Sequence, residues 1–304
     1  MITRLPVAIL AYPGSLDSAV LGLQDIIGHA NGISDTVLDL AVLNTFQPHP
    51  ERYAALILPP SAGPVFAEEV PQISDFLVGQ HRTGAVVCSA CTGLAFIAEA
   101  DLTGGRLVTT HWGLAQHLRA AYPGLQLDTD QLLIEYSDLV TAGGLMAWVD
   151  LALALIERFQ GHDVALETAR HFIVEFKRRD QRRFHRFLPE LRHGDQAVLK
   201  AQHHLEARYR DPLTVRDMAE VSGLPGRSFQ RRFKTATGLS PQAYLQELRI
   251  ERARVLLIET KTSVSEICYA VGYNDPPSFI RLFGRLAGLT PRAFREQFRR
   301  KNAR

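Results

Sequence analysis

The hydrophobic pattern of residues 1–176 alternates between short apolar runs and longer segments with helical spacing. Short apolar runs bounded by Gly or Pro favour buried strands, and spacing of three to four residues favours helices. We expect strands at residues 5–12, 37–44, 53–60 and 84–90, and helices at residues 18–31, 68–82, 92–100 and 144–159. Strands that alternate with helices predict βαβ units and a parallel sheet.

After Asp195 the strand signals disappear and the pattern becomes helical. We expect Thr214 to cap the second of these helices, Gly223 to end it, and Pro241 to open the longest one. The expected helices are residues 197–209, 214–223, 226–238, 241–259, 263–273, 276–288 and 291–300. The chain therefore predicts an α/β domain followed by an all-α domain.

The charge is divided between the same two parts. Residues 1–194 hold 14 Lys/Arg and 21 Asp/Glu, net −7, whereas residues 195–304 hold 20 and 11, net +9. A part this basic indicates a polyanionic partner such as nucleic acid, with a solvated basic surface as the alternative. Residues 177–192 carry seven Lys/Arg, and we interpret the longer stretch 167–196 as a helix end running into a basic linker with a boundary at 189–195. A solvated helix face is the alternative.

A short pattern is repeated within the basic part. Residues 228–244 and 278–294 share Ser, Phe, Arg, Phe, Gly, Leu, Pro and Ala at the same offsets. In each copy a short apolar-faced helix, a turn with Gly223 or Gly272, and a second helix follow one another, which is the layout of a helix-turn-helix. The second helices pack through Phe pairs and expose polar residues, namely Arg227, Gln230, Arg231 and Lys234 in the first copy and Arg281 and Arg285 in the second.

Residues 197–301 resemble the DNA-binding domain of AraC/XylS-type transcription regulators, through the stretches 217–257 and 265–295. The resemblance implies sequence-specific binding to double-stranded DNA, usually by an activator. It assigns base contacts to Arg227, Gln230 and Arg231 in the first unit, and to Pro277, Ile280 and Arg281 in the second. Arg suits guanine and Gln suits adenine, whereas Pro277 and Ile280 offer apolar contacts only, so the second unit is expected to read less sequence. Phosphate contact is the alternative role for each Arg.

Residues 84–112 contain a strand, Cys91 at a sharp turn, a short helix and then His111. This is the layout of a nucleophile elbow, where a helix N-terminus is expected to lower the pKa of the thiol and His111 is a candidate base. Residues 4–176 resemble the class I glutamine amidotransferase-like (ThiJ/PfpI) superfamily, in the branch fused to AraC-type domains. The resemblance implies a flavodoxin-like three-layer sandwich with Cys91 at the elbow and His111 near it. We expect this domain to span residues 1–188 and the DNA-binding domain residues 195–304.

The sequence departs from the enzymes that this resemblance suggests. Gly113 stands where glutaminases carry an acid after the His, and Ala19 aligns with the acid that other members place in the first helix. A Cys–His pair without an orienting acid is a weak catalytic unit. We therefore expect no enzyme, and no catalytic, metal or cofactor site, but a pocket for a small-molecule effector. The candidate pocket residues are Cys91, His111, Trp112, Ser61 and Gly63.

The sequence thus predicts a transcription regulator that senses an effector through its first domain. A Cys-dependent amidase or hydrolase and a thiol-based redox sensor are the alternatives. We also expect a homodimer, and contact with RNA polymerase as a further partner. Three Cys, no signal peptide and no apolar stretch long enough for a bilayer predict a cytoplasmic chain with no membrane contact.

Overall fold

The computed structural model describes residues 2–46, 52–64, 67, 70–176 and 180–299. The chain divides into two compact units, Met1–Gln181 and Arg182–Arg304. The last helix of the first unit ends at His171, within the segment in which the sequence predicts a helix end followed by a basic linker. Residues 177–179 of that segment lie outside the described residues, and residues 182–194 belong to the second unit.

The first unit contains a six-stranded sheet in the order β2-β1-β3-β4-β8-β7. All neighbours pair in parallel except β7 and β8, which form an antiparallel edge. The strands are β1 (Thr3–Leu10), β2 (Thr36–Leu43), β3 (Ala55–Leu58), β4 (Val86–Ala90), β7 (Leu133–Glu135) and β8 (Leu139–Ala142). A separate parallel pair consists of β5 (Leu107–Val108) and β6 (Gln126–Leu127). The mainly parallel sheet confirms the expected fold class.

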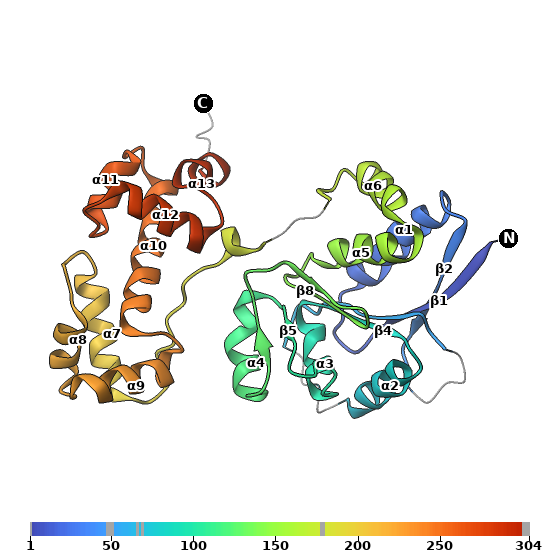
Figure 1. The fold of residues 1–304 in the computed structure, drawn as a ribbon, viewed down its shortest axis with the longest axis horizontal. Coiled ribbons are helices and arrows are strands. Elements are labelled where there is room, and N and C mark those ends of the chain that lie inside the picture. Colours follow the sequence, from blue (N-terminus) through green and yellow to red (C-terminus); the bar gives the residue numbers. More distant parts are fainter. Residues whose placement is uncertain (1, 47–51, 65–66, 68–69, 177–179, 300–304) are drawn as a thin grey trace. The chain divides into compact units, whose positions relative to one another are not determined.

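Helices cover both faces of this sheet, as Figure 1 shows. One face packs against α1 (Asp17–Asn31), α5 (Trp148–Gln160) and α6 (His162–His171), and the other against α2 (Pro71–Arg82), α3 (Leu94–Glu99) and α4 (Ala115–Ala121). Alternate strand residues serve the two layers: Val7 and Ile9 face the first, Ala8 and Leu10 the second. Strands buried on both faces explain the nearly continuous apolar runs of the sequence.

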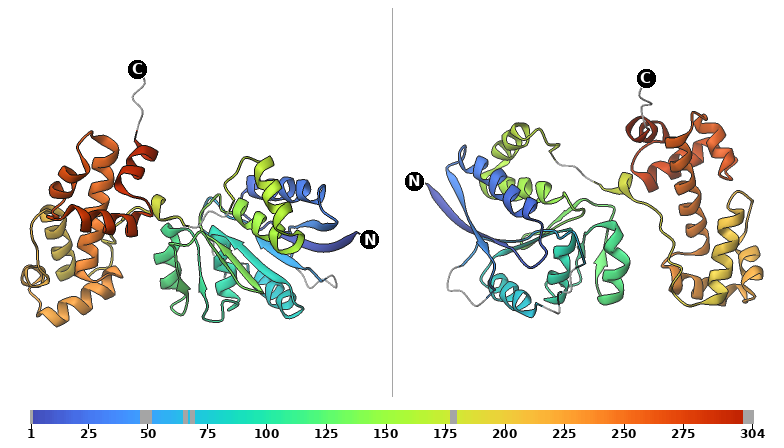
Figure 2. Two further views of the ribbon diagram at one scale, coloured as in Figure 1. Left: turned by 45° about the horizontal axis from the view of Figure 1, so that its top comes forward. Right: turned by 180° about the vertical axis from the view of Figure 1, so that it is seen from behind.

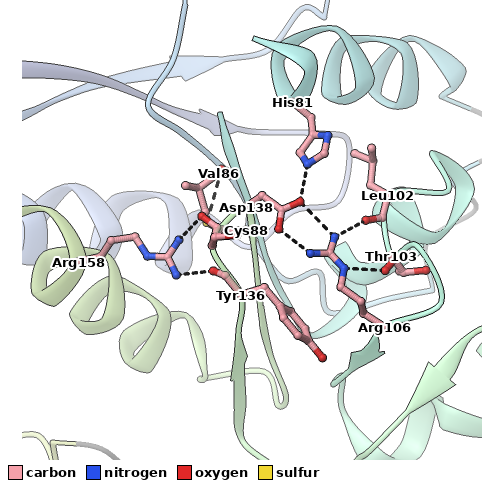
Figure 3. Close-up of polar contacts among 10 residues, drawn as sticks. His81, Val86, Cys88, Leu102, Thr103, Arg106, Tyr136, Asp138 and Arg158 are labelled. Carbon is pink, nitrogen blue, oxygen red and sulfur yellow. Dashed lines mark hydrogen bonds and ion pairs between the residues drawn. The ribbon is translucent and has the colours of Figure 1, made fainter. Parts of the chain in front are cut away.

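A polar cluster holds the turn before β8, at the amino end of that strand (Figure 3). Asp138 accepts hydrogen bonds from Arg106 (2.5 Å to Nη1) and contacts Nε2 of His81 at 2.7 Å. The Arg106 hydrogen bond is the main reason that the pKa of Asp138 is lowered to about 2. Arg158 donates to the carbonyl oxygens of Tyr136 and Ser137. These contacts stabilise the edge hairpin, and they lie at the opposite end of the strands from Cys91.

The second unit consists of helices and the loops between them, with no strand among its described residues (Figure 2). Its helices are α7 (Gln196–Arg208), α8 (Val215–Ser222), α9 (Gly226–Thr237), α10 (Pro241–Glu259), α11 (Val264–Ala270), α12 (Pro276–Ala287) and α13 (Pro291–Phe298). Thr214 caps α8 and Gly223 ends it in a left-handed conformation, as the sequence predicts. Pro241 opens α10, whose bounds match the expected ones.

The helical unit has two hydrophobic cores joined by α10. The first core holds Phe229, Phe233 and Tyr244, and the second holds Phe279, Phe283 and Phe294. Each core fills one copy of the repeated pattern, which explains why the same residues recur fifty positions apart. The long helix supplies Leu245 and Leu248 to the first core and Ile250, Ala253 and Leu257 to the second.

Candidate functional sites

Cys91 lies at the turn between β4 and the short helical segment that leads into α3. Its φ is +55°, a left-handed conformation that is unusual for a residue with a side chain and is stabilised here by the surrounding packing. Glycine is required two residues later, at Gly93, because a Cβ there would lie 2.8 Å from the carbonyl oxygen of Leu58. The thiol is therefore held at the carboxyl edge of the sheet by close packing of the elbow on β3.

Buried hydroxyl groups bring the neighbouring loops to this elbow. Thr92 Oγ1 accepts a hydrogen bond from the Ser61 backbone N–H at 2.6 Å and lies 3.1 Å from Ser61 Oγ. Ser61 Oγ also donates to the carbonyl oxygen of Gly63 at 2.7 Å. The hydroxyl of Tyr12 donates to Pro59 O and lies 3.4 Å from Thr92 Oγ1. The carboxyl ends of parallel strands are where open α/β sheets bind ligands, so these loops form a candidate site.

His111 enters the same site from the segment after β5. Thr110 Oγ1 donates to the carbonyl oxygen of Cys91 at 2.7 Å, and the His111 backbone hydrogen-bonds the Cys91 thiol. The imidazole Nδ1 accepts the backbone N–H of Gly113 at 3.0 Å, and the ring of Trp112 lies 5.0 Å from the imidazole ring. A donor at Nδ1 places the remaining ring proton on Nε2 and favours the neutral imidazole. Burial lowers the pKa of His111 further.

The expected activation of Cys91 is wrong. Burial raises the pKa of its thiol to about 11, and hydrogen bonds from the backbone of Thr92 and His111 offset only part of that effect. Only 4% of the residue is exposed. An apolar environment disfavours the thiolate more than the short helix favours it, so the thiol is neutral near pH 7. Cys88 is fully buried in the core, as expected.

Alkylation of Cys91 by iodoacetamide is expected to accelerate about tenfold for each pH unit between about pH 7 and 10. The raised pKa of about 11 means that the thiolate fraction is still rising throughout this range. Mass spectrometry of the alkylated peptide measures the rate and separates Cys91 from Cys88. A rate that levels off below about pH 8 would instead show an activated thiolate.

The structure thus places the five candidate pocket residues at one edge of the sheet. Ser61, Gly63 and Cys91 are connected through Thr92, and His111 and Trp112 are adjacent to Cys91 through Thr110. Their role in binding an effector stays a prediction. Sequence reasoning missed Tyr12, Thr92 and Thr110; the available signal was the position of each two residues beyond the end of a strand. Ala19 is fully buried in α1 and contributes no carboxylate.

The first helix-turn-helix consists of α8 and α9. Thr214 and Asp217 form a capping box that begins α8, and Met218 and Ala219 bury its apolar face. Phe229 and Phe233 are fully buried on the inner side of α9. Arg227, Gln230, Arg231 and Lys234 are exposed on the outer side.

The second helix-turn-helix, α11 and α12, repeats this construction. Ser263 and Glu266 form its capping box, and the N-cap Asp275 accepts the backbone N–H of Ser278 at 3.1 Å. Gly272 has a φ of +88°, and a Cβ there would lie 2.6 Å from the carbonyl oxygen of Arg210, so the turn needs glycine. Pro277, Ile280, Arg281 and Arg285 are all exposed on α12.

The eight predicted DNA-contacting residues therefore lie on the exposed sides of α9 and α12, where a major groove would receive them. Their contacts with bases or phosphates stay a prediction. Arg232 lies on the same helix, α9, but its guanidinium is bound within the protein. It forms a bidentate ion pair with the Asp195 carboxylate, at 2.8 and 2.7 Å, and thereby links α9 to the N-cap of α7.

Two known protein families match separate parts of the chain. The DJ-1/PfpI family matches residues 29–158, and a helix-turn-helix domain family matches residues 218–297. The chain joins a DJ-1/PfpI domain to an AraC-type helix-turn-helix domain. The first match contains the elbow with Cys91 and His111, and the second contains all eight exposed residues of α9 and α12.

Two relatives of the chain are named transcriptional regulators. It is 31% identical over 224 residues to the HTH-type transcriptional regulator ArgR of Pseudomonas aeruginosa, covering 72% of this chain and 66% of that protein. It is 29% identical over 224 residues to the HTH-type transcriptional regulator GlxA of Rhizobium meliloti, covering 71% and 67%. For the first four relatives the matched region spans 60–66% of their length.

Among solved structures, a putative transcriptional regulator protein from Vibrio parahaemolyticus is 17% identical, with a TM-score of 0.49. The match covers 56% of this chain and 99% of that one. Across the part of the chain that the structure describes, no helix is both long and apolar enough to cross a bilayer.

Proposed function

We propose that the protein is a sequence-specific DNA-binding transcription regulator, acting as an activator. The observation that carries this proposal is the pair of exposed polar helices, α9 and α12, each built on its own core within a segment of net charge +9. Two such helices joined by one long helix suit successive major grooves, ~34 Å apart. DNA binding is assigned to residues 195–304.

Residues 1–188 are proposed to bind a small-molecule effector at the elbow site and to form a homodimer. Each protomer would then cover an asymmetric site of about two major grooves. Sedimentation of the full chain as a monomer at micromolar concentration would exclude the dimer. RNA polymerase is the proposed partner of the activated complex.

The test of DNA binding uses duplexes selected by the full chain from a random library. A regulator should enrich one motif and discriminate against a single mismatch by about 1–3 kcal/mol per base pair. Enrichment of no motif, with equal affinity for all duplexes, would leave only a basic surface and would refute the proposal.

Arg231→Ala is expected to weaken binding to the selected duplex by about 1–3 kcal/mol and to relax discrimination at one base pair. Its guanidinium is exposed on α9, where it suits the major-groove edge of guanine. Competition with duplexes mutated at each position measures both effects. Arg170→Ala, an exposed Arg in the first unit, is the matched control and should change neither. A uniform loss across all sequences would assign Arg231 to a phosphate.

We further propose that the DJ-1/PfpI domain recognises a ligand without turnover. The Gly113 N–H donates to His111 where an orienting acid would accept, so the imidazolium that a catalytic base must form is disfavoured. Purified protein should show no turnover of glutamine, small amides or glyoxals above background, while Cys91→Ala keeps its affinity for DNA. Turnover that disappears in Cys91→Ala would establish the hydrolase alternative instead.

A further inference from the structure

Gln181, the last residue of the first unit, is buried directly behind the elbow site. Its exposed fraction is 3%, and its backbone N–H donates to the carbonyl oxygen of Asp130 at 3.0 Å. Its side-chain Nε2 donates to Thr110 O at 2.8 Å and to Gln131 O at 3.2 Å. A Cβ on Gly143 would lie 2.2 Å from this nitrogen, so the glycine leaves the space that the amide occupies.

Thr110 connects this glutamine to the elbow. The residue accepts from Gln181 through its carbonyl oxygen, and donates through Oγ1 to the carbonyl oxygen of Cys91 at 2.7 Å. The next residue, His111, contacts the thiol through its backbone and carries the imidazole of the site. A ligand that moves the turn at Thr110 and His111 therefore changes the hydrogen bonds of Gln181.

The residues that follow Gln181 are held by the helical unit instead. Arg182 donates from Nη1 to the carbonyl oxygen of Arg285, in the last turn of α12, at 3.0 Å. Arg254, which is 5% exposed, donates to the carbonyl oxygens of His185 and, at 3.0 Å, of Leu286. The ring of Phe187 packs edge-on against Tyr244 of the first core at 4.9 Å. Residues 182–187, called the strap below, thus contact both halves of the helical unit.

We propose that Gln181 is the positioning residue that couples the elbow site to the second helix-turn-helix. The inference rests on the proposed function and names the regulation of its effector site. Gln181 is hydrogen-bonded to Thr110, and Arg182 is hydrogen-bonded to α12. The two residues are consecutive in the chain, so no residue separates these contacts. A shift of the Thr110 carbonyl strains or releases the strap, and the strap is bonded to the C-terminal turn of α12. Because coupling between sites is reciprocal, DNA bound to α9 and α12 must in turn alter the elbow.

The test measures the alkylation rate of Cys91 by iodoacetamide in the full chain, with and without the selected duplex. In the unsubstituted protein, DNA is expected to change this rate by about fivefold, because the conformation of the elbow that DNA favours exposes the Cys91 thiol to a different degree. In Gln181→Ala the change should fall below about twofold although DNA is still bound. Gly143→Ala should also reduce the effect of DNA on the alkylation rate, because its methyl group would occupy the space of the Gln181 amide.

Gln160→Ala is the matched control. This glutamine also donates from its amide to a backbone carbonyl of the first unit, that of Thr36 at 2.6 Å, but at the amino end of the sheet. It should leave the effect of DNA on Cys91 intact, so a loss in Gln160→Ala would overturn the specific role of Gln181. A DNA effect that persists at full size in Gln181→Ala, or is absent from the unsubstituted protein while DNA is bound, would also overturn the inference. Failure to bind any duplex would overturn the proposed function itself.

Discussion

Raising the salt concentration from about 50 to about 200 mM is expected to weaken DNA binding by about 10³-fold. Two helix-turn-helix units in successive grooves imply about six phosphate contacts, about three for each unit, and each releases a counterion. The net charge of +9 in residues 195–304 supplies the cations. Fluorescence anisotropy of a labelled duplex measures the dissociation constant at each salt concentration.

Lys234→Ala and Arg285→Ala test which residues contact phosphates, because Lys234 is exposed on the outer side of α9 and Arg285 on that of α12. If they contact phosphates, each substitution should reduce the slope of log affinity against log salt by about one, without altering the preferred sequence. Three contacts from one unit would give a loss of only about 40-fold over the same salt range. A loss of about 40-fold or less would therefore contradict the binding of both helix-turn-helix units.

Arg254→Ala is expected to destabilise the helical unit by about 3–5 kcal/mol. The guanidinium is buried in α10, pairs with Glu251 at 3.1 Å, and donates to carbonyl oxygens of α12 and of the strap. Alanine would leave these acceptors without their donor and the glutamate without its partner, in a setting that water reaches poorly. Urea unfolding followed by far-ultraviolet circular dichroism measures the loss.

Arg252→Ala provides the comparison within the same helix. Arg252 pairs with Glu206 on the surface, where both side chains are more than 40% exposed, and such pairs contribute about 0–1 kcal/mol. If both substitutions cost the same, burial of Arg254 would not be the source of its effect.

Local signals in the sequence were sufficient for the helical unit. Ser240 caps α10 and Pro241 opens it, so the start of this helix was predictable to the residue. The repeated Phe pairs marked the inner sides of α9 and α12 before any contact was known. Arg254 was the exception, because a charged residue within a helix is normally expected outside; its position among Ile250, Ala253 and Leu257 was the available signal.

The α/β unit was less predictable at its antiparallel edge. The segments of β7 and β8 are three and four residues long, too short for a period to be visible, so no strand was expected there. The helix expected from residue 144 begins instead at Trp148, after a loop that contains Gly144 with a φ of +101°. The missed strands depend on the pairing of β7 with β8, whereas the later start of the helix follows the local conformation of Gly144.

The candidate site was located from the sequence, but its electrostatics were not. A strand, a Cys and a helix start predict an elbow, whereas the degree of burial that raises the pKa of Cys91 depends on all the loops packed over it. Gln181 gave no signal either, since it lies within a basic run and its partners are 38 to 71 residues away in the chain: Gly143, Gln131 and Thr110.

The separate cores of the helical unit have a consequence for how its specificity evolves. Phe229 and Phe233 support one reading surface and Phe279 and Phe283 the other. The two cores meet at α10 and at Tyr209, which packs against both, so most of the packing beneath α9 is not shared with α12. Substitutions at distant sites without common neighbours have additive effects on stability. Mutations can therefore accumulate on one recognition helix while the other keeps its operator contacts, and a duplicated binding unit of this kind can acquire a new half-site by single steps.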